Sequence, residues 1–331
     1  MRLSVVVPCH NEAGNVGPLA AQLLPVLAGL TDDFEVIFID DGSRDDTAAR
    51  VRVLAAGEPR VRLLRFARNF GKEAALTAGL DHASGDAVIL MDADLQHPPA
   101  MLPRLVEAWQ GGADMVIAAR SNRDTDSWLR RVFTLTFYRL FNLLSEVEVT
   151  PQSGDFRLLD RRAVTALQAL PERGRFMKGL YALVGLETVT TPYVHAGRHD
   201  GRSRFGLRRL WRFAVDGLTS FTSAPLRVWA YVGFVLALSA GLYALYLVLR
   251  TVVLGVDVPG YASLATMILF FSGVQLVGLG VLGEYLGRVY AEAKQRPLYI
   301  ISDAVGDLAP GAQRAHGGIV LPARRTRATD D

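Results

Sequence analysis

Residues 87–99 read Ala87-Val-Ile-Leu-Met-Asp-Ala-Asp-Leu-Gln-His-Pro-Pro99, an apolar run that ends on two carboxylates. The apolar part is typical of a buried strand in a parallel sheet. Ligands of such sheets bind beyond the carboxyl ends of the strands, where Asp92 and Asp94 follow directly. Two carboxylates at that position could hold a hard divalent cation that is shared with substrate phosphates. A strand followed by an ordinary polar turn explains the same letters, because Asp and Pro are common turn residues.

The first 120 residues alternate apolar strand candidates with helix-forming stretches. Strands that alternate with helices predict βαβ units and a mainly parallel sheet. We therefore expect an α/β fold of the Rossmann-like, nucleotide-binding type. Further along the chain we expect longer helices, a polar loop at 150–155 and a short strand near the end. The expected strands are 3–7, 34–39, 61–66, 87–91, 115–118 and 298–304, and the expected helices are 16–28, 45–56, 72–83, 100–109, 129–144 and 161–170.

Two stretches in the last third of the chain carry no charge. They cover 22 residues at 228–249 and 23 residues at 261–283. At 1.5 Å rise per residue each helix would reach about 33 to 35 Å, enough to cross the roughly 30 Å core of a bilayer. We expect two transmembrane helices, with a pair of buried core helices as the alternative. Before them, residues 207–222 place apolar side chains at helical spacing among arginines, which suits an amphipathic helix at the membrane surface or a helix packed on the soluble domain.

The placement of charges predicts the membrane orientation. Arginine and lysine flank the two spans, whereas the loop between them carries only Arg250 and Asp257. By the positive-inside rule, the first domain and both termini are expected in the cytoplasm, at the inner (plasma) membrane. The net charge of +3 does not indicate a nucleic-acid partner, because the arginines cluster beside the spans. The single cysteine, Cys9, agrees with a reducing compartment.

Polar loops follow the first, second, fourth and fifth expected strands, the last of them including Arg120, and their side chains would converge at one edge of the sheet. The first loop reads Pro8-Cys-His-Asn-Glu12 and the second Asp40-Asp-Gly-Ser43. Asp40 or Asp41 would accept hydrogen bonds from base or ribose donors, unless this loop only connects the strand to the next helix and caps it. The histidines of the loops are not at metal-ligand spacing, and we interpret them as polar loop residues: His10, His97 and His195.

Five motifs occur in one order along the chain: Pro8-x-x-Asn11-Glu12, Asp40-Asp41-Gly42-Ser43, Arg68-Asn69-x-Gly71-Lys72, Asp92-Ala-Asp94-Leu-Gln96-His-Pro98-Pro99 and Ser153-Gly154-Asp155-Phe156-Arg157. This order resembles inverting family 2 glycosyltransferases of the GT-A fold. With the two C-terminal spans, the chain is similar to the polyprenyl-phosphate glycosyltransferases, which include undecaprenyl-phosphate sugar transferases and dolichol-phosphate mannose synthases. The resemblance covers about residues 3–295. It implies a cytoplasmic GT-A domain that transfers a sugar from a nucleoside diphosphate sugar to a lipid phosphate.

The resemblance also implies roles for the motif residues. Asp92, Asp94 and Gln96 would hold Mg²⁺ or Mn²⁺, and such an ion would stabilise the charge of the leaving diphosphate, which makes Asp94 a catalytic candidate. Arg198 and Arg204 would clamp the diphosphate, or would instead meet anionic headgroups. The nucleotide sugar is expected to bind Pro8, Asn11, Glu12, Asp40, Asp41, Lys72, Asp92, Arg198 and Arg204, and the lipid phosphate is expected to bind Arg120 and Arg131, with Arg130 as an alternative to Arg131.

Asp155 matches the proposed general base of the family and is the second catalytic candidate. A phosphate monoester has a second pKa of about 6 and is largely dianionic at neutral pH, so the acceptor needs little help in losing a proton. Asp155 could instead orient the acceptor or balance positive charge on the oxocarbenium-like sugar. A plain turn residue after Gly154 is the third interpretation.

The sequence therefore predicts a membrane enzyme that makes a polyprenyl-phosphate sugar with inversion, as a donor for modification of cell-envelope glycans, with UDP-glucose favoured as substrate. A processive polysaccharide synthase is one alternative, but Arg208-Arg-Leu-Trp211 lacks the glutamine of that class's Gln-x-x-Arg-Trp motif. A non-catalytic lipid-binding or flippase partner is another. Glycines in the second span allow a homotetramer. We divide the chain into a GT-A domain (1–206), an amphipathic interfacial helix (207–226), two transmembrane helices (227–291) and a largely disordered cytoplasmic tail (292–331).

Overall fold

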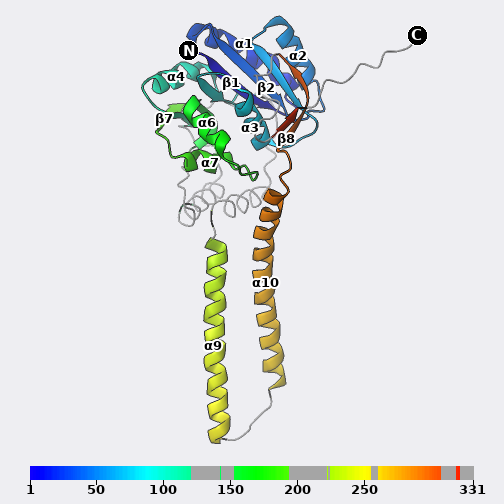
Figure 1. Cartoon of the computed structure of the whole chain (residues 1–331), viewed down its shortest axis with the longest axis vertical. Coiled ribbons are helices and arrows are strands. Elements are labelled where there is room, and N and C mark those ends of the chain that lie inside the picture. Colours follow the sequence, from blue (N-terminus) through cyan, green and yellow to red (C-terminus); the bar gives the residue numbers. More distant parts are fainter. Residues whose placement is uncertain are drawn as a thin grey trace, which may run out of the picture.

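A mixed sheet layered with helices forms one end of the molecule, and two long helices project from it (Figure 1). The computed structural model describes residues 1–120, 142, 153–193, 222, 224–254, 260–306 and 318–320. Apart from residue 142, the helix expected at 129–144 lies outside these residues, and so does most of the amphipathic segment expected at 207–226.

The sheet domain contains most of the secondary structure. Its elements are β1 (Leu3–Cys9), α1 (Ala13–Leu30), β2 (Phe34–Asp40), α2 (Thr47–Gly57), β3 (Val61–Phe66), α3 (Lys72–His82), β4 (Ala87–Leu90), the 3₁₀ helix η1 (Pro99–Met101), α4 (Leu102–Gln110), β5 (Met115–Arg120), β6 (Ser153–Asp160), α6 (Arg161–Ala169), α7 (Met177–Val184) and β7 (Thr188–Tyr193). They are followed by the long helices α9 (Ala224–Leu254) and α10 (Tyr261–Ala293) and by the short strands β8 (Tyr299–Val305) and β9 (Gly318–Val320).

The strands lie in the order β7-β5-β6-β4-β1-β2-β3-β8-β9. Strands β3, β2, β1 and β4 form a parallel centre, in which Leu3 pairs with Phe34 on one side and with Ala87 on the other. This confirms the expected α/β fold with a mainly parallel sheet. Strand β6 runs antiparallel between β4 and β5, and β8 runs antiparallel to β3. The carboxyl ends of β1, β2 and β4 therefore meet at one edge, where the polar loops follow.

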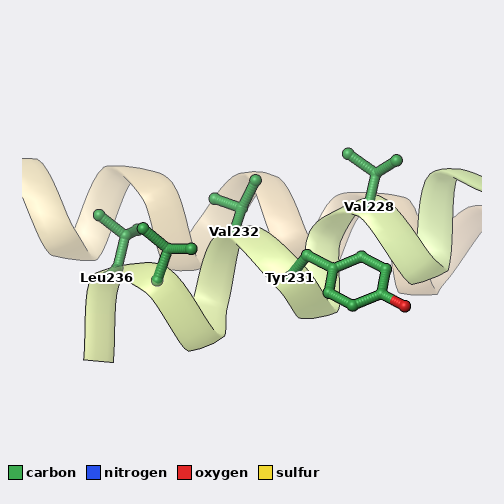
Figure 2. A pocket seen from close by; sticks show the side chains of 5 residues that line it. Val228, Tyr231, Val232 and Leu236 are labelled. Carbon is green, nitrogen blue, oxygen red and sulfur yellow. The ribbon is translucent and has the colours of Figure 1, made fainter. Parts of the chain in front are cut away.

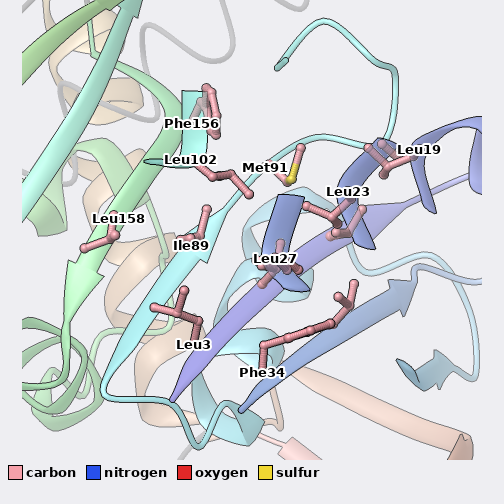
Figure 3. Packing of buried hydrophobic residues seen from close by; sticks show 14 of the residues in the cluster. Leu3, Leu19, Leu23, Leu27, Phe34, Ile89, Met91, Leu102, Phe156 and Leu158 are labelled. Atoms are coloured by element: carbon pink, nitrogen blue, oxygen red, sulfur yellow. The ribbon is translucent and has the colours of Figure 1, made fainter. Parts of the chain in front are cut away.

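The core lies on both faces of this parallel centre. Helix α1 turns Leu19, Leu23 and Leu27 toward Leu3 and Phe34 of the sheet (Figure 3). Their spacing of four residues puts them on one face of the helix, and burying each contributes about 1.5 to 3 kcal/mol. Helix α3 packs on the opposite face of the sheet. By length and composition alone α1 could also cross a membrane, but its apolar face is packed in this core.

Strand β6 begins at Ser153, inside the polar loop that we expected at 150–155, and so corrects its last three residues. Its residues Phe156 and Leu158 are fully buried, and Arg157 between them is also buried and pairs in register with Leu90 of β4. Because Asp155, Arg157 and Asp160 interrupt its apolar residues, the hydrophobic pattern of the sequence does not indicate this strand. Edge strand β7 was equally hidden, because most of its side chains are exposed.

The strand expected at 298–304 exists as β8, but it completes the sheet. Tyr299 is fully buried and stacks on Phe66, with ring centroids 5.3 Å apart. Its hydroxyl donates a hydrogen bond of 2.8 Å to Asp81 Oδ2. Strands β8 and β9 therefore belong to the sheet, although our division of the chain puts their residues within a separate, largely disordered tail at 292–331. Residues 307–317 and 321–331 of that tail lie outside the described part of the chain.

Helices α9 and α10 run side by side away from the sheet domain (Figure 1). Leu226–Leu247 and Thr266–Ala293 are apolar and long enough to cross a membrane, and apolar side chains are exposed along both. Near its start α9 carries an apolar groove of about 340 Å³ (Figure 2), lined by Val228, Tyr231, Val232, Val235 and Leu236. Exposed apolar surface of this extent belongs in a lipid environment, so the chain is membrane-associated.

The two long helices are in contact at a glycine, where the indole of Trp229 on α9 lies against Gly278 of α10. A Cβ atom built on Gly278 would lie 1.8 Å from Nε1 of Trp229 on α9. Only a residue without a side chain leaves room for the indole, and small residues serve the same purpose at close helix contacts in membranes.

Replacing Gly278 by Leu is expected to push the helices apart and to cost about 1 to 3 kcal/mol of stability, as overpacking usually does. Gly280 is the matched control, because no atom lies within 4 Å of a Cβ built there. Thermal unfolding in detergent compares Gly278→Leu with Gly280→Leu. Equal losses in the two variants would contradict the close contact.

A buried polar cluster lies at the amino-terminal edge of the sheet, away from the polar loops. Glu35 accepts hydrogen bonds from Ser4 Oγ at 2.6 Å and from the backbone N–H of Ser84 at 2.7 Å, and it pairs with buried Arg62. His82 is fully buried nearby, and Arg62 donates to its carbonyl. Burial, reinforced by the charge of Arg62, lowers the pKa of His82 to about 4.

His82 predicts a loss of stability in acid. In the unfolded chain the pKa of His82 is about 6.5, and in the folded protein it is about 4. Between these pH values the unfolded chain binds a proton at His82 that the folded protein does not bind. The contribution of neutral His82 to the free energy of unfolding is therefore fully present above about pH 6.5, and about 2 kcal/mol of it should be lost at about pH 5. His82→Gln should show a smaller fall in unfolding temperature between pH 7 and 5 than the wild type. Identical falls would contradict the prediction.

Candidate active site

A cavity of about 200 Å³ opens at the carboxyl edge of the parallel strands. Three loops and the start of α3 form its walls. The lining residues are Pro8, Cys9, Glu12, Asp41, Lys72, Ala75, Asp92, Ala93 and Asp94. The structure thus brings together the strand-end carboxylates that the sequence placed after β1, β2 and β4.

Lys72 joins two sides of the cavity. Its Nζ lies 2.6 Å from Asp92 Oδ1 and 2.7 Å from Asp155 Oδ2. Although burial alone would lower it, the charges of Asp92 and Asp155 raise the pKa of Lys72 above its ordinary value. Burial would likewise raise the pKa of Asp155, but Lys72 outweighs it and holds that pKa well below its usual range. Asp155 is therefore a firmly ionised carboxylate.

Residues 92–97 form a tight turn after β4. Asp94 Oδ1 accepts a hydrogen bond of 3.1 Å from the backbone N–H of Gln96, and Leu95 takes a left-handed conformation with φ 63°. The chain then returns, so that Nδ1 of His97 accepts a hydrogen bond of 2.9 Å from the backbone N–H of Asp92. The turn keeps the carboxylates of Asp92 and Asp94 on the cavity side.

The loop after β2 is supported by its own carboxylates. Asp41 accepts hydrogen bonds from the backbone N–H groups of Phe70 at 2.6 Å and Gly71 at 3.0 Å. Burial raises the pKa of Asp41 in spite of these donors. Gly42 has φ +65°, and a Cβ there would lie 2.4 Å from the carbonyl carbon of Arg68, so only glycine fits this turn.

Comparison with known proteins decides the family. Residues 4–167 match the model of glycosyl transferase family 2, and residues 224–289 match the GtrB C-terminal hairpin. The bactoprenol glucosyl transferase of Shigella phage SfV is 47% identical over 92% of this chain and 99% of its own length. The chain belongs to glycosyl transferase family 2. The resemblance inferred from the order of the motifs is confirmed.

Other relatives of this family 2 transferase are similar along nearly their whole length. The uncharacterized glycosyltransferase sll0501 of Synechocystis sp. is 46% identical over 92% of this chain and 96% of its own. Among solved structures, glucosyl-3-phosphoglycerate synthase from Mycobacterium tuberculosis, in complex with Mn²⁺, UDP-glucose and phosphoglyceric acid, is 24% identical. It covers 66% of this chain and 77% of its own with a TM-score of 0.46.

Two further residues that were predicted to bind the nucleotide sugar, Asn11 and Asp40, do not line the cavity of this transferase. Asn11 is exposed, and its Oδ1 accepts a hydrogen bond of 2.9 Å from the backbone N–H of Arg44. Asp40 is fully buried behind the cavity, where it pairs with Arg65 at 3.2 Å and accepts from the backbone N–H of Ser43 at 2.9 Å. Of the two neighbouring carboxylates, Asp41 is thus the one that reaches the cavity.

Several predicted arginines cannot be placed by side chain. Arg120 ends β5, and only its backbone is described. Arg131, Arg198 and Arg204 lie outside the described residues.

The predicted metal ligands have suitable chemistry. Asp92 and Asp94 line the same cavity and offer hard carboxylate oxygens, which suit Mg²⁺ or Mn²⁺. Within the described ranges no group of three or more His, Cys, Asp or Glu side chains could hold a metal ion. An ion would therefore need further oxygens, from the amide of Gln96 or from the phosphates of a ligand.

Sequence reasoning missed part of the site. Ala93 and Cys9 also line the cavity, but from the sequence we considered Cys9 only as a sign of a reducing compartment and gave Ala93 no role. Glu73, next to Lys72, is half-buried and accepts a hydrogen bond of 3.2 Å from the backbone N–H of Met177. Burial, with the charge of Asp155, raises the pKa of Glu73 to about 7. His97 was interpreted as a polar loop residue, whereas its ring is buried within the site.

Proposed function

We propose that this transferase moves glucose from UDP-glucose to undecaprenyl (bactoprenol) phosphate at the membrane, with inversion at the anomeric carbon. The observation that carries the proposal is the 47% identity with a bactoprenol glucosyl transferase over 92% of this chain and 99% of the relative. The product would be a lipid-linked glucose donor for cell-envelope glycans.

The carboxylate cavity supports a site for the diphosphate end of the donor. Asp92, Asp94 and Gln96 would hold Mg²⁺ or Mn²⁺ together with phosphate oxygens. When bound, the ion would supply positive charge that offsets the negative charge of the departing UDP. Lys72 lies between this position and Asp155, so its ammonium group can add to that charge. Pro8, Glu12 and Asp41 would line the remainder of the donor site, with Asn11 and Asp40 supporting its loops.

On the acceptor side we assign Asp155 a role in orientation. A carboxylate whose pKa is held far below neutrality is a weak base, and a lipid phosphate is largely dianionic at neutral pH. A phosphate oxygen of the acceptor would attack the anomeric carbon from the side opposite UDP, in one displacement. Asp155 would then face the developing positive charge of the sugar ring.

The arginines complete the proposal. We expect Arg120 and Arg131 to bind the lipid phosphate, and Arg198 and Arg204 to bind the diphosphate of the donor. They stay predictions.

The membrane arrangement is also part of the proposal. We propose that α9 and α10 are the two spans, because they are exposed and apolar, whereas α1 is packed in the core. Both termini would be cytoplasmic, which puts the active site on the side where nucleotide sugars are made. A homotetramer stays a prediction.

The test is transfer from a panel of radiolabelled nucleotide sugars to undecaprenyl phosphate, with purified protein in detergent and with Mg²⁺, Mn²⁺ or a chelator. Metal-dependent labelling of the lipid from UDP-glucose alone is the expected result. Labelling from a different donor would change the sugar but keep the reaction. Folded protein that labels no lipid with any donor would overturn the proposal.

A further inference from the structure

We propose that His97 is a positioning residue, which holds the turn that carries Asp92 and Asp94 in register with the strand that carries Asp155. The proposal rests on the proposed function, since it assigns these carboxylates to the donor and acceptor ends of one reaction. His97 would touch neither substrate.

The first half of the evidence is the hydrogen bond to the turn. The backbone N–H of Asp92 donates to Nδ1 of His97 at 2.9 Å, so Nδ1 must carry a lone pair and the ring proton lies on Nε2. This bond closes the turn across Leu95, whose left-handed backbone is unfavourable for a leucine and needs support from its surroundings. Without the acceptor, the N–H of Asp92 would lose its partner and the turn could relax.

The second half is the stacking of the ring on β6. His97 and Phe156 are nearly parallel, at 10°, with ring centroids 4.8 Å apart. Tyr193 of β7 meets both rings edge-on, at 6.4 Å from His97 and 5.8 Å from Phe156. Phe156 is fully buried and directly follows Asp155 in the chain. Movement of the His97 ring would therefore be passed to the backbone next to Asp155.

The two contacts of His97 serve different ends of the reaction. Its Nδ1 holds the donor-side turn, and its ring face holds the acceptor-side strand. Lys72 also joins these two sides, but through flexible side chains at the cavity surface, whereas the His97 contacts are buried below it. A substitution that removes only one of these contacts should therefore change either the Mn²⁺ requirement or the ratio of transfer to hydrolysis, depending on which contact is lost.

Two variants separate the contacts. His97→Phe keeps a flat ring for Phe156 but offers no acceptor to Asp92. We expect it to raise the Mn²⁺ concentration for half-maximal transfer about 10- to 100-fold, the usual effect of losing an outer partner of a metal site. His97→Asn keeps an acceptor, because its Oδ1 occupies the place of Nδ1, but removes the stacked ring. It should keep the Mn²⁺ requirement and lower transfer to lipid about 10- to 100-fold relative to hydrolysis of the donor by water.

Amide hydrogen exchange gives a readout that does not depend on the reaction. In peptides that cover residues 88–98, exchange should be faster in His97→Phe than in the wild type and close to the wild type in His97→Asn. In peptides that cover 153–158 the order should reverse. Phe156→Leu should lower transfer relative to hydrolysis as His97→Asn does. The double variant His97→Asn/Phe156→Leu should be little worse than either single variant, because both substitutions remove the same stacking contact.

The outcomes distinguish this inference from the proposed function. If the wild type labels no lipid, the proposed function fails, and the exchange pattern still decides the role of His97. If both His97 variants lose activity in parallel with their folded fraction, with unchanged Mn²⁺ requirement and equal exchange, His97 only stabilises the fold and the inference is overturned.

Discussion

Replacing Asp94 by Asn should lower kcat/KM for glucosyl transfer by at least about 10³-fold, comparable with the loss of a principal charge-stabilising group. Asn keeps a side-chain oxygen that can accept the hydrogen bond from the N–H of Gln96, so the turn after β4 should survive. What is lost is a negative charge on the wall of the cavity. The effect of this variant therefore reports on the charge and not on the shape of the turn.

The measurement is initial-rate transfer over a range of Mn²⁺ and Mg²⁺ concentrations, with unfolding temperature as a check on folding. Asp32→Asn is the matched control, because Asp32 is exposed in the turn before β2, away from the cavity. It should retain wild-type activity. An Asp94→Asn protein that works within about threefold of the wild type would remove Asp94 from the catalytic centre.

Replacing Lys72 by Met should have an effect of similar size, a loss of about 10²- to 10³-fold in kcat/KM. The substitution leaves the carboxylates of Asp92 and Asp155 facing the cavity without the ammonium group that now lies within 2.7 Å of each. It also removes positive charge from the proposed position of the leaving diphosphate. Methionine matches the length of the lysine stem, so packing changes little.

The pH profile gives Lys72→Met a distinct signature. In the wild type Lys72 lowers the pKa of Asp155, so Asp155 stays ionised further into the acid range than an ordinary aspartate. Without the lysine that pKa rises, and activity that needs the carboxylate should fall at a higher pH than in the wild type. Lys294→Met, at the end of α10, is the control and should leave the profile unchanged. An unshifted acid limb in Lys72→Met would contradict the role of the ion pair.

The parallel centre of the sheet could be predicted because most residues of its strands are apolar, although β2 contains Glu35 and β3 contains Arg62 and Arg65. The expected strand 61–66 coincides with β3, and the expected strands at 34–39 and 87–91 differ from β2 and β4 by one residue. Strand β6 was missed because Ser153, Gly154 and Asp155 form a polar run that is typical of a loop, and Arg157 follows two residues later. That arginine is tolerated in the core because its guanidinium lies 3.6 Å above the ring of Tyr181, a partner that no local pattern reveals.

The candidate site shows the same limit. Carboxylates at strand ends could be assigned to one edge, because parallel strands deliver their carboxyl ends together. Which of two adjacent carboxylates reaches the cavity depends on distant partners, since Asp40 is turned to Arg65 and Asp41 to the amides of Phe70 and Gly71. The ion pair between Lys72 and Asp155 joins residues far apart in the chain, so only the folded structure reveals it.

The pairing of β8 with β3 has a consequence for how the protein is made on the ribosome. Phe66 emerges about 230 residues before Tyr299, the residue that stacks on it. At about 5 to 20 residues per second, the β3 edge waits roughly 12 to 45 seconds for its neighbour. During that interval both apolar helices leave the ribosome and can enter the bilayer. The sheet domain thus stays unfinished until both apolar helices have been made, and an exposed strand edge in that interval is a template for pairing with other nascent chains.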